Sequence, residues 1–363
     1  MSVSCGIVGL PNVGKSTIFN ALTSAQAEQG NYPFCTIEPN VATVEVPDPN
    51  LQRIRALIES EKIIPAICQV TDIAGLIKGA SQGEGMGNKF LSNIRECDAI
   101  MQVVRCFEGS GVVREEPVDP VGDMEIIELE LVLADLETVK KAMERNQKRL
   151  RSLDKDAVKD QETFEKALAV LADDKLLRTV EWSDREKQAL KPLCLMTSKS
   201  MLYVANVADD DMLGEGELAQ RVARYAEASG AEWIPFCGDL ESELRKMDDD
   251  ERAEFMAELG VEQLGLAALI SSVYKTLGLQ TYYTAGPKEI RAWTVRRGAK
   301  APQAAGVIHT DFEKGFIRAE VYDVEDLIEC KSEAGIRSAG RLRTEGRDYV
   351  MQEGDVCHFL IGK

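Results

Sequence analysis

The stretch that decides the fold is Gly9-Leu10-Pro11-Asn12-Val13-Gly14-Lys15-Ser16-Thr17, close to the amino terminus. The apolar run at 4–8 comes directly before it and predicts a short buried strand, and the pattern at 18–22 predicts a helix directly after it. The stretch therefore shows G-x-x-x-x-G-K-S between a strand and a helix, which is the setting that a phosphate-binding P-loop requires. We expect an α/β fold of the P-loop nucleoside triphosphatase type.

The residue types in this loop explain its chemistry. Glycines let backbone N–H groups approach phosphate oxygens closely, and the start of a helix adds a positive dipole. Lys15 is expected to reach the β and γ oxygens, and the Ser16 hydroxyl is expected to ligate Mg²⁺. The residues expected to bind the nucleotide phosphates are Asn12, Val13, Gly14, Lys15, Ser16 and Thr17.

Two companion motifs follow the loop. The apolar run at 67–71 ends in Asp72-Ile73-Ala74-Gly75. A D-x-x-G at the end of a strand lets Asp72 hold Mg²⁺ through water while the N–H of Gly75 meets the γ-phosphate. In the turn-rich stretch between the motifs, Thr36 is a candidate second Mg²⁺ hydroxyl, and the alternative is a solvent-facing threonine.

A further strand, predicted at 201–205, ends in the candidate base-reading motif Asn206-Val207-Ala208-Asp209. Guanine-binding GTPases have N-K-x-D here, and the aspartate accepts two hydrogen bonds from guanine. Val207 replaces the lysine, so the guanine motif is incomplete. A weaker strand at 234–238 is expected to end at another loop near the base.

The position after D-x-x-G bears on catalysis. Ras-like enzymes have a glutamine there that orients the attacking water, and this chain has Leu76. We therefore expect slow intrinsic turnover that an activator raises. Asn12, beside the phosphates, is suited to hold a monovalent cation such as K⁺, and the alternative is that Asn12 only caps the turn.

The net charge divides the chain into regions. The 363 residues include 43 Lys and Arg and 61 Asp and Glu, which gives a net charge of −18. Residues 1–128 have 9 basic and 17 acidic side chains and 194–279 have 7 and 17, whereas 129–193 and 280–363 are balanced at 14 to 14 and 13 to 13. An acidic chain is unsuited to coating DNA, because phosphate binding needs concentrated Lys and Arg. The balanced segments remain compatible with a nucleic-acid partner.

The first balanced segment predicts an antiparallel helical hairpin. Its apolar residues recur at heptad-like spacing, first at Leu129, Leu133, Leu136, Met143, Leu150 and Leu153, and then at Phe164, Leu168, Leu171, Leu176 and Leu177. Positions 140–151 contain six basic residues and a single acid, Glu144. This basic stretch is either a solvated helix face or a contact for RNA phosphates.

The second balanced segment, 280–363, predicts short strands at 289–296, 315–321 and 355–361 and a short helix near 302–306. Its scattered arginines are not interleaved with stacking aromatic residues. A docking module is therefore expected here, not one that reads a nucleic-acid sequence.

The remaining composition indicates a cytoplasmic protein. The amino terminus has no basic region followed by a long apolar run, and no stretch approaches the roughly 20 apolar residues that span a bilayer. The nine cysteines are scattered and never form C-x-x-C, and the histidines are His309 and His358. Disulfides, a structural zinc site, a histidine triad and a membrane partner are therefore not expected.

Taken together, these motifs resemble the YchF-type Obg-like ATPases over essentially the whole chain. The most specific stretches are 31–40 (NYPFCTIEPN), 72–91 (DIAGLIKGASQGEGMGNKFL) and 282–298 (YYTAGPKEIRAWTVRRG). The resemblance implies an Obg-type G domain at 1–128 and 194–279. It also implies a coiled-coil hairpin inserted at 129–193 and a C-terminal β-grasp domain of the TGS type at 280–363.

The resemblance also implies a function. The family prefers ATP to GTP, hydrolyses it with Mg²⁺ at positions matching Ser16 and Thr36, and associates with ribosomes. We expect the large subunit as the partner, contacted through the hairpin and the TGS domain. The family is implicated in oxidative stress, and Cys35 is the candidate redox-sensitive thiol because it adjoins Thr36.

Two departures from the family pattern leave alternatives. Asp209 stands where the family usually has Glu, and a shorter carboxylate of this kind suits guanine, so a GTPase is the second hypothesis. Arg114 stands where the family usually has a histidine that helps hydrolysis. Arginine is no general base, although it could stabilise phosphate charge as an internal finger. A nucleotide-gated binding module with negligible turnover is the third hypothesis.

Overall fold

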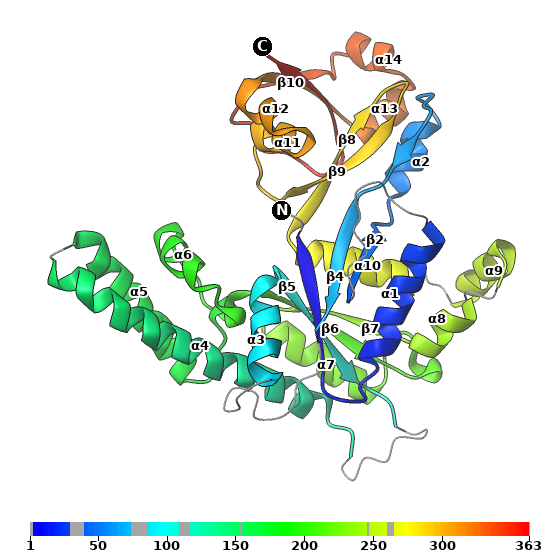
Figure 1. Cartoon of the computed structure of the whole chain (residues 1–363). Helices are drawn as coiled ribbons and strands as arrows, with labels where there is room; N and C mark the ends of the chain where they lie inside the picture. The colour runs from blue at the N-terminus through cyan, green and yellow to red at the C-terminus, as the bar shows by residue number, and fades with distance from the viewer. Residues whose placement is uncertain are drawn as a thin grey trace. The chain divides into compact units, whose positions relative to one another are not determined.

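The computed structural model describes residues 3–29, 40–73, 86–108, 117–152, 154–244, 247–259 and 265–362. The chain forms two compact units, one of residues 1–43 and 69–277 and the other of residues 44–68 and 278–363 (Figure 1). We call them the first and second unit. No helix among the described residues is both long enough and apolar enough to cross a membrane.

The first unit is built on a six-stranded sheet in the order β2-β4-β1-β5-β6-β7. The strands are β1 (Ser4–Val8), β2 (Val41–Glu45), β4 (Ile67–Asp72), β5 (Ala99–Arg105), β6 (Ser200–Asn206) and β7 (Glu232–Phe236). β1 is parallel to β4 and β5, and β6 is parallel to β5 and β7. The carboxyl ends of these five strands therefore share one edge, where ligands bind in sheets of this kind.

The helices cover the faces of this sheet. They are α1 (Lys15–Gln29), α3 (Met86–Glu96), α7 (Glu217–Ala228) and α10 (Gly265–Thr276). The unit also has α8 (Gly238–Leu244), which contacts α1, and α9 (Asp249–Leu259). All seven residues of β5 are buried, as expected for a parallel strand covered on both faces. The strands predicted at 4–8, 67–71 and 201–205 are confirmed, whereas the one predicted at 234–238 ends at Phe236 because α8 begins at Gly238.

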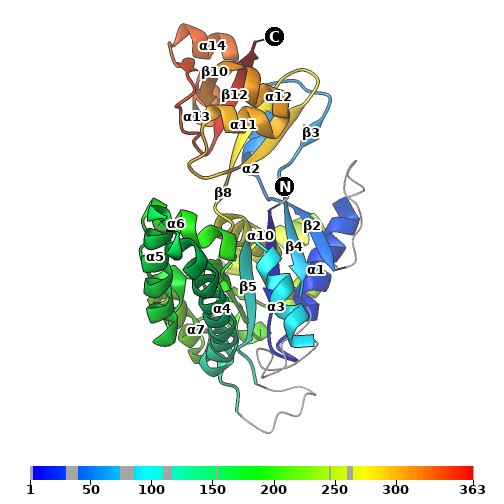
Figure 2. The same cartoon turned by 60° about the vertical axis from the view of Figure 1, so that its left-hand side comes forward.

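The predicted hairpin is present as α4 (Pro120–Arg151) and α5 (Lys155–Ala172), which pack side by side (Figure 2). The predicted boundary at 129 falls inside α4. The first turns of that helix lie in the core of the sheet, where Met124 and Ile127 are fully buried. The hairpin is therefore joined to the core of the first unit by one continuous helix, α4.

The leucine pattern predicted for α4 is confirmed only in part. Leu129 is 47% exposed, whereas Leu136 and Met143 are partly buried against the hairpin core. Within the hairpin, the buried stripe of α4 runs at spacings of three and four residues through Val132, Asp135, Val139, Ala142 and Asn146. Three of these five residues are small or polar, so the leucines alone did not mark the stripe.

A buried carboxylate ties α4 to the sheet. Glu128 accepts hydrogen bonds from the hydroxyl groups of Tyr203 on β6 and Tyr225 on α7, the latter at 2.6 Å. Arg178, from the returning end of the insert, donates to the same carboxylate at 2.6 Å. Burial raises the pKa of both tyrosine hydroxyls, so they remain donors at neutral pH.

Replacing Glu128 with alanine is expected to lower the free energy of unfolding by about 3 kcal/mol, because the buried Arg178 guanidinium loses its counter-charge. Chemical denaturation followed by circular dichroism measures this loss. Glu144→Ala, which removes an exposed glutamate from the same helix, is the control and is expected to change stability by less than about 0.5 kcal/mol. Equal losses in the two variants would contradict this assignment.

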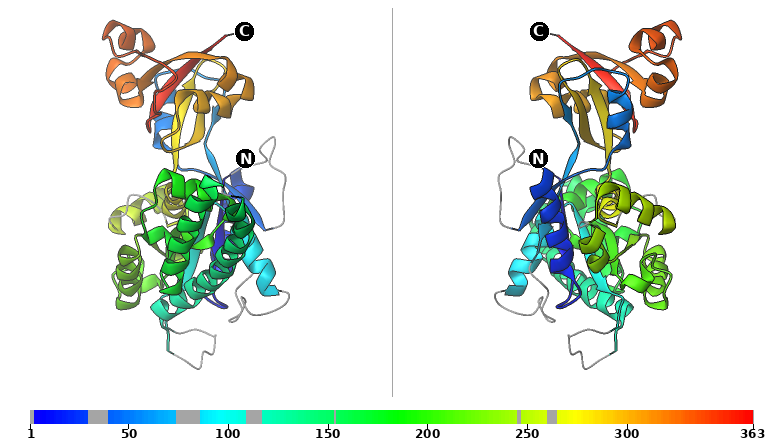
Figure 3. Two further views of the ribbon diagram at one scale, coloured as in Figure 1. Left: turned by 90° about the vertical axis from the view of Figure 1, so that its left-hand side faces the viewer. Right: turned by 90° about the vertical axis from the view of Figure 1, so that its right-hand side faces the viewer.

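The second unit has a mixed six-stranded sheet in the order β11-β10-β12-β8-β9-β3, with helices against it (Figure 3). Its strands are β3 (Ile63–Ile64), β8 (Leu279–Ala285), β9 (Ile290–Arg296), β10 (Phe316–Asp323), β11 (Arg343–Glu345) and β12 (Asp355–Ile361). Its helices are α2 (Pro49–Arg55), α11 (Ala301–Ile308), α12 (Thr310–Gly315), α13 (Val324–Cys330) and α14 (Glu333–Ser338). The strands predicted in 280–363 are confirmed within two residues at each end, and the predicted short helix corresponds to α11.

Residues 44–68 differ from the predicted domain boundaries, which assigned them to the G domain. The hydroxyl of Tyr283 donates to the Asp48 carboxylate at 2.8 Å, and Arg53 forms two hydrogen bonds of 2.7 Å with Glu325. β3 also pairs with β9. These partners are far away in the sequence. Predicted domains made of long contiguous segments therefore did not show that residues 44–68 belong to the second unit.

Candidate nucleotide-binding site

The predicted P-loop connects β1 to α1 at the carboxyl edge of the first sheet. Asn12 and Gly14 have positive φ angles of 63° and 94°. A Cβ on Gly14 would lie 2.0 Å from Nδ2 of Asn206, so both the backbone angle and the space require glycine. The Asn206 side chain donates to the Val13 carbonyl at 2.9 Å and ties the end of β6 to the loop.

Lys15 and Asp72, predicted from separate motifs, meet in the structure. The Lys15 ammonium forms a hydrogen-bonded ion pair with the Asp72 carboxylate, and their side chains are 14% and 23% exposed. The sheet explains this meeting, since β4 is the parallel neighbour of β1 and Ile7 pairs with Asp72. The pair itself was not predicted, because the motifs assign Lys15 to phosphate and Asp72 to the metal ion.

A cavity of about 730 Å³ opens at this edge. Of the predicted binding residues, it is lined by Asn12, Gly14, Lys15, Ser16, Thr17, Asn206, Val207 and Asp209. Val13 is not among the lining residues, because its side chain is fully buried in the core. The structure thus brings the phosphate motif and the base-reading motif into one site.

The sequence predicts a loop near the base after the strand at 234–238, and Gly238 and Asp239 confirm it. Asp239 itself, Phe107 and Glu108 were not predicted as lining residues. They follow the carboxyl ends of β5 and β7, which flank β6. A signal for them existed in the strand order, since every loop at this edge of a parallel sheet is a candidate binding loop. That order is not readable from one sequence.

The turn after β7 approaches the P-loop helix closely. A Cβ on Gly238 would lie 2.7 Å from Cγ2 of Thr17, so a larger residue would push the turn away from α1. The N–H of Val207 donates to the carbonyl of Phe236 at 3.0 Å. The loops that follow β6 and β7 therefore lie side by side at the wall of the cavity.

The donor groups at this edge fit Mg²⁺. Ser16 offers a hydroxyl and Asp72 a carboxylate, and Mg²⁺ prefers such oxygen ligands while keeping several waters and phosphate oxygens. The described part of the chain has no cluster of three or more His, Cys, Asp or Glu side chains that could hold a metal ion. A magnesium ion bound with the nucleotide would neutralise phosphate charge. The predicted residues Cys35, Thr36, Gly75, Leu76 and Arg114 lie outside the described residues.

A larger cavity, of about 1030 Å³, lies at the amino ends of β5 and β6 and is the weaker candidate. Two of its basic side chains already have partners: Lys275 pairs with Glu232 at 2.9 Å, and Lys199 donates to the carbonyls of Ile94 and Arg95 at 2.8 and 2.7 Å. Burial lowers the pKa of Lys199. The P-loop and its companion motifs are at the opposite edge of the sheet.

Two family models match the chain. Residues 4–150 match a family described as 50S ribosome-binding GTPase, and residues 279–362 match YchF-GTPase_C, described as a protein of unknown function. The two matches agree with the positions of the P-loop in the first unit and of the mixed sheet in the second.

Full-length relatives are similar over nearly the whole chain. The "Ribosome-binding ATPase YchF" of Pasteurella multocida is 51% identical over 360 residues, and that of Bacillus subtilis is 49% identical over 362, with 99% of each chain covered. The solved structure of the Schizosaccharomyces pombe YchF GTPase matches with a TM-score of 0.88 at 37% identity, covering 99% of this chain and 98% of that one. The chain therefore belongs to the YchF family of P-loop nucleoside triphosphatases.

Proposed function

We propose that the protein is a ribosome-associated ATPase that acts as a nucleotide-dependent switch. The observation that supports this most strongly is the single cavity that unites the P-loop with the motif from Asn206 to Asp209. Asp72 adjoins it through its ion pair with Lys15. The printed name of the bacterial relatives, ribosome-binding ATPase, supports the choice of ATP and of the partner.

In this proposal, water attacks the γ-phosphorus, the bond to the bridging β-oxygen breaks, and ADP and phosphate leave. The loop amides and Lys15 hold the phosphate oxygens, and Ser16 and Thr36 ligate Mg²⁺. Asp72 would help to hold Mg²⁺ through water, and the Gly75 N–H would contact the γ-phosphate. Arg114 is proposed to stabilise the charge that develops there.

Two regulatory features belong to the same proposal. The backbone of Asn12 is in the left-handed region, which asparagine tolerates, so Asn12 helps to form the turn. Asn12 also lines the cavity, and its side-chain amide is a candidate K⁺ ligand. Cys35 adjoins Thr36 in the chain, and oxidation of its thiol would place a polar group beside a metal ligand.

Titration of the protein with ATP and with GTP in the presence of Mg²⁺ tests the choice of nucleotide. We expect ATP to bind at least about tenfold more tightly, which is about 1.4 kcal/mol. Tighter binding of GTP would favour the second hypothesis, a GTPase, which Asp209 supports because it lines the cavity. The absence of phosphate release with ribosomes and potassium present would favour the nucleotide-gated binding module.

The ribosome is proposed to contact the hairpin and the C-terminal TGS domain, on the large subunit. The exposed face at the end of α4 supports this proposal, because it has Lys140, Arg145, Lys148 and Arg151 on its surface. RNA phosphates are the partner that such a face fits. Cytoplasmic localisation follows from the same partner.

A further inference from the structure

The base end of the cavity has two carboxylates. Asp209 follows β6 and Asp239 follows β7, and both line the cavity. The thiol of Cys237 has a raised pKa, mainly through burial, and the negative charges of Asp239 and Asp209 add to the increase. Both carboxylates therefore lie within electrostatic range of one sulfur atom, on the paired loops that form this wall.

The structure holds Asp239 in a defined place. It is the second residue of α8, directly after Gly238, whose close approach to Thr17 fixes the turn against α1. Two residues further along α8, the buried Glu241 accepts a hydrogen bond from the backbone N–H of Leu266 at 3.1 Å and anchors α8 to α10. Asp239 therefore lies in the first turn of a helix that contacts with α1 and α10 hold in place.

The charges of the cavity wall are unequally distributed. Among the described residues that line it, the single cation is Lys15, on the phosphate loop. The loops that follow β6 and β7 contribute Asp209 and Asp239 and no Lys or Arg, and Val207 stands where guanine-binding motifs have lysine. A base bound at this wall meets hydrogen-bond acceptors.

Purine position 6 distinguishes two nucleotide classes at such a wall. Adenine has an amino group there, which donates hydrogen bonds, whereas guanine and hypoxanthine have a carbonyl oxygen, which accepts them. A carboxylate accepts hydrogen bonds from the amino group and repels the oxygen, so its contact with the base favours the 6-amino group. Asp209 alone could satisfy guanine at N1 and N2, so a second carboxylate is needed to disfavour guanine.

We propose that Asp239 is a specificity-determining residue that reads purine position 6 and selects 6-amino over 6-oxo nucleotides. This inference rests on the proposed function only in that the cavity binds a purine nucleotide. The carboxylate of Asp239 would explain why ATP binds in preference to GTP, which Asp209 alone does not explain.

The test uses the full-length protein, Mg²⁺ and four triphosphates: ATP, GTP, ITP and 2,6-diaminopurine riboside triphosphate. GTP and ITP share the 6-oxo group and differ at position 2, whereas the diaminopurine nucleotide combines the 2-amino group of GTP with the 6-amino group of ATP. We expect the wild-type protein to bind both 6-amino nucleotides more tightly than both 6-oxo nucleotides.

Asp239→Asn replaces the carboxylate by an amide that can donate to a 6-oxo group. We expect it to shift the ratio of 6-oxo to 6-amino affinities at least tenfold toward 6-oxo, and we expect Asp239→Ala to shift it less. Asp210→Asn is the matched control, because Asp210 is exposed in the neighbouring loop and does not line the cavity. Thermal melting of each variant confirms folding.

The outcomes separate the two proposals. A ratio in Asp239→Asn within twofold of the wild type would overturn the role of Asp239, and so would an equal shift in Asp210→Asn. If the wild type prefers GTP but Asp239→Asn moves the ratio further toward 6-oxo, the choice of ATP fails and the role of Asp239 stands. Failure of all four nucleotides to bind would contradict both proposals.

Discussion

Replacing Lys15 with methionine is expected to lower kcat/KM for ATP hydrolysis at least a hundredfold, or about 2.7 kcal/mol of transition-state stabilisation. Lys15 is the single cation among the described lining residues, and it is held at the loop by Asp72. Methionine keeps a long unbranched side chain and removes the ammonium group, with its charge and its hydrogen-bond donors. Phosphate release over a range of ATP concentrations, with ribosomes present, measures the effect.

Two variants make this result specific. Lys175→Met removes an exposed lysine of the insert that pairs with Asp173, and it is expected to leave turnover unchanged. Asp72→Asn keeps Lys15 but removes the metal-orienting charge, so ATP should still bind while its dependence on Mg²⁺ weakens. The Lys15–Asp72 pair is largely buried, so thermal melting has to show that Lys15→Met and Asp72→Asn remain folded. Turnover in Lys15→Met within threefold of the wild type would refute the proposed role.

The sequence predicted the parts of the site that are contiguous in the chain. The loop from Asn12 to Thr17 is read directly, because its chemistry depends on neighbouring residues and on the strand and helix at its ends. The strands at β1, β4 and β6 are apolar runs that end in polar motifs, and they could be predicted within one residue. Short-range periodicity is sufficient for such elements.

The parts that depend on pairing between distant segments could not be predicted. Asp239 enters the site only because β7 lies beside β6, and the Lys15–Asp72 pair forms only because β4 lies beside β1. The excursion of 44–68 depends on β9 and Tyr283 of the second unit. Leu129 was misplaced for a related reason, since the sheet and α5 together decide which face of α4 is buried.

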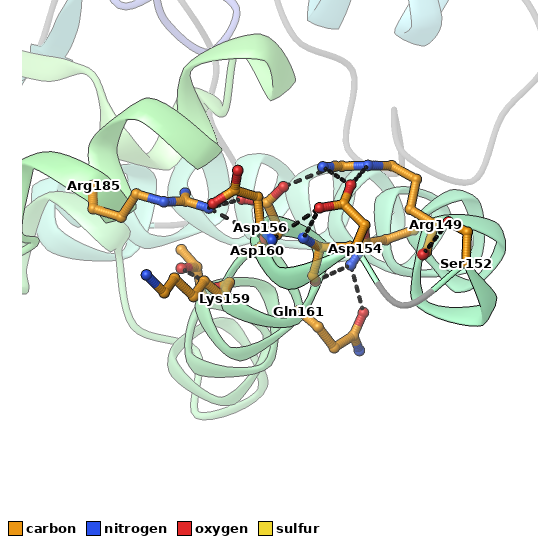
Figure 4. A network of polar contacts seen from close by, with 11 residues as sticks. Arg149, Ser152, Asp154, Asp156, Lys159, Asp160, Gln161 and Arg185 are labelled. Atoms are coloured by element: carbon orange, nitrogen blue, oxygen red, sulfur yellow. Dashed lines mark hydrogen bonds and ion pairs between the residues drawn. The ribbon is translucent and has the colours of Figure 1, made fainter.

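The exposed basic face at the end of α4 is the basis for the second prediction, a loss of ribosome binding when its charge is reversed. Figure 4 shows that Arg149 is occupied within the hairpin, because it pairs with Asp154 and Asp160 at 2.8 Å each, and Arg185 pairs with Asp160 at 2.6 Å. The residues that remain exposed and make no ion pair with a described residue are Lys140, Arg145, Lys148 and Arg151. At 100° per residue they lie opposite the buried stripe, over about 17 Å of helix.

Reversing two of these charges, in the double variant Arg145→Glu and Lys148→Glu, is expected to weaken ribosome binding at least tenfold at about 0.1 M salt. Each RNA phosphate contact that is lost should also reduce the slope of log K against log salt by about 0.7 to 0.9. Co-sedimentation with ribosomes at several salt concentrations gives both quantities. Nucleotide affinity should not change, since neither residue lines the P-loop cavity.

The control is a second double variant on the other helix of the hairpin, Lys155→Glu and Lys159→Glu. It changes the net charge by the same amount, and both lysines are exposed near the start of α5. If the two double variants weaken binding equally, the effect reflects the charge of the whole chain and not this face. If the α4 variant binds like the wild type, the face is only solvated, and the ribosome contact has to be sought in the second unit. A loss confined to the α4 variant requires a contact there, because the two variants share every long-range electrostatic change and differ only in which face they alter.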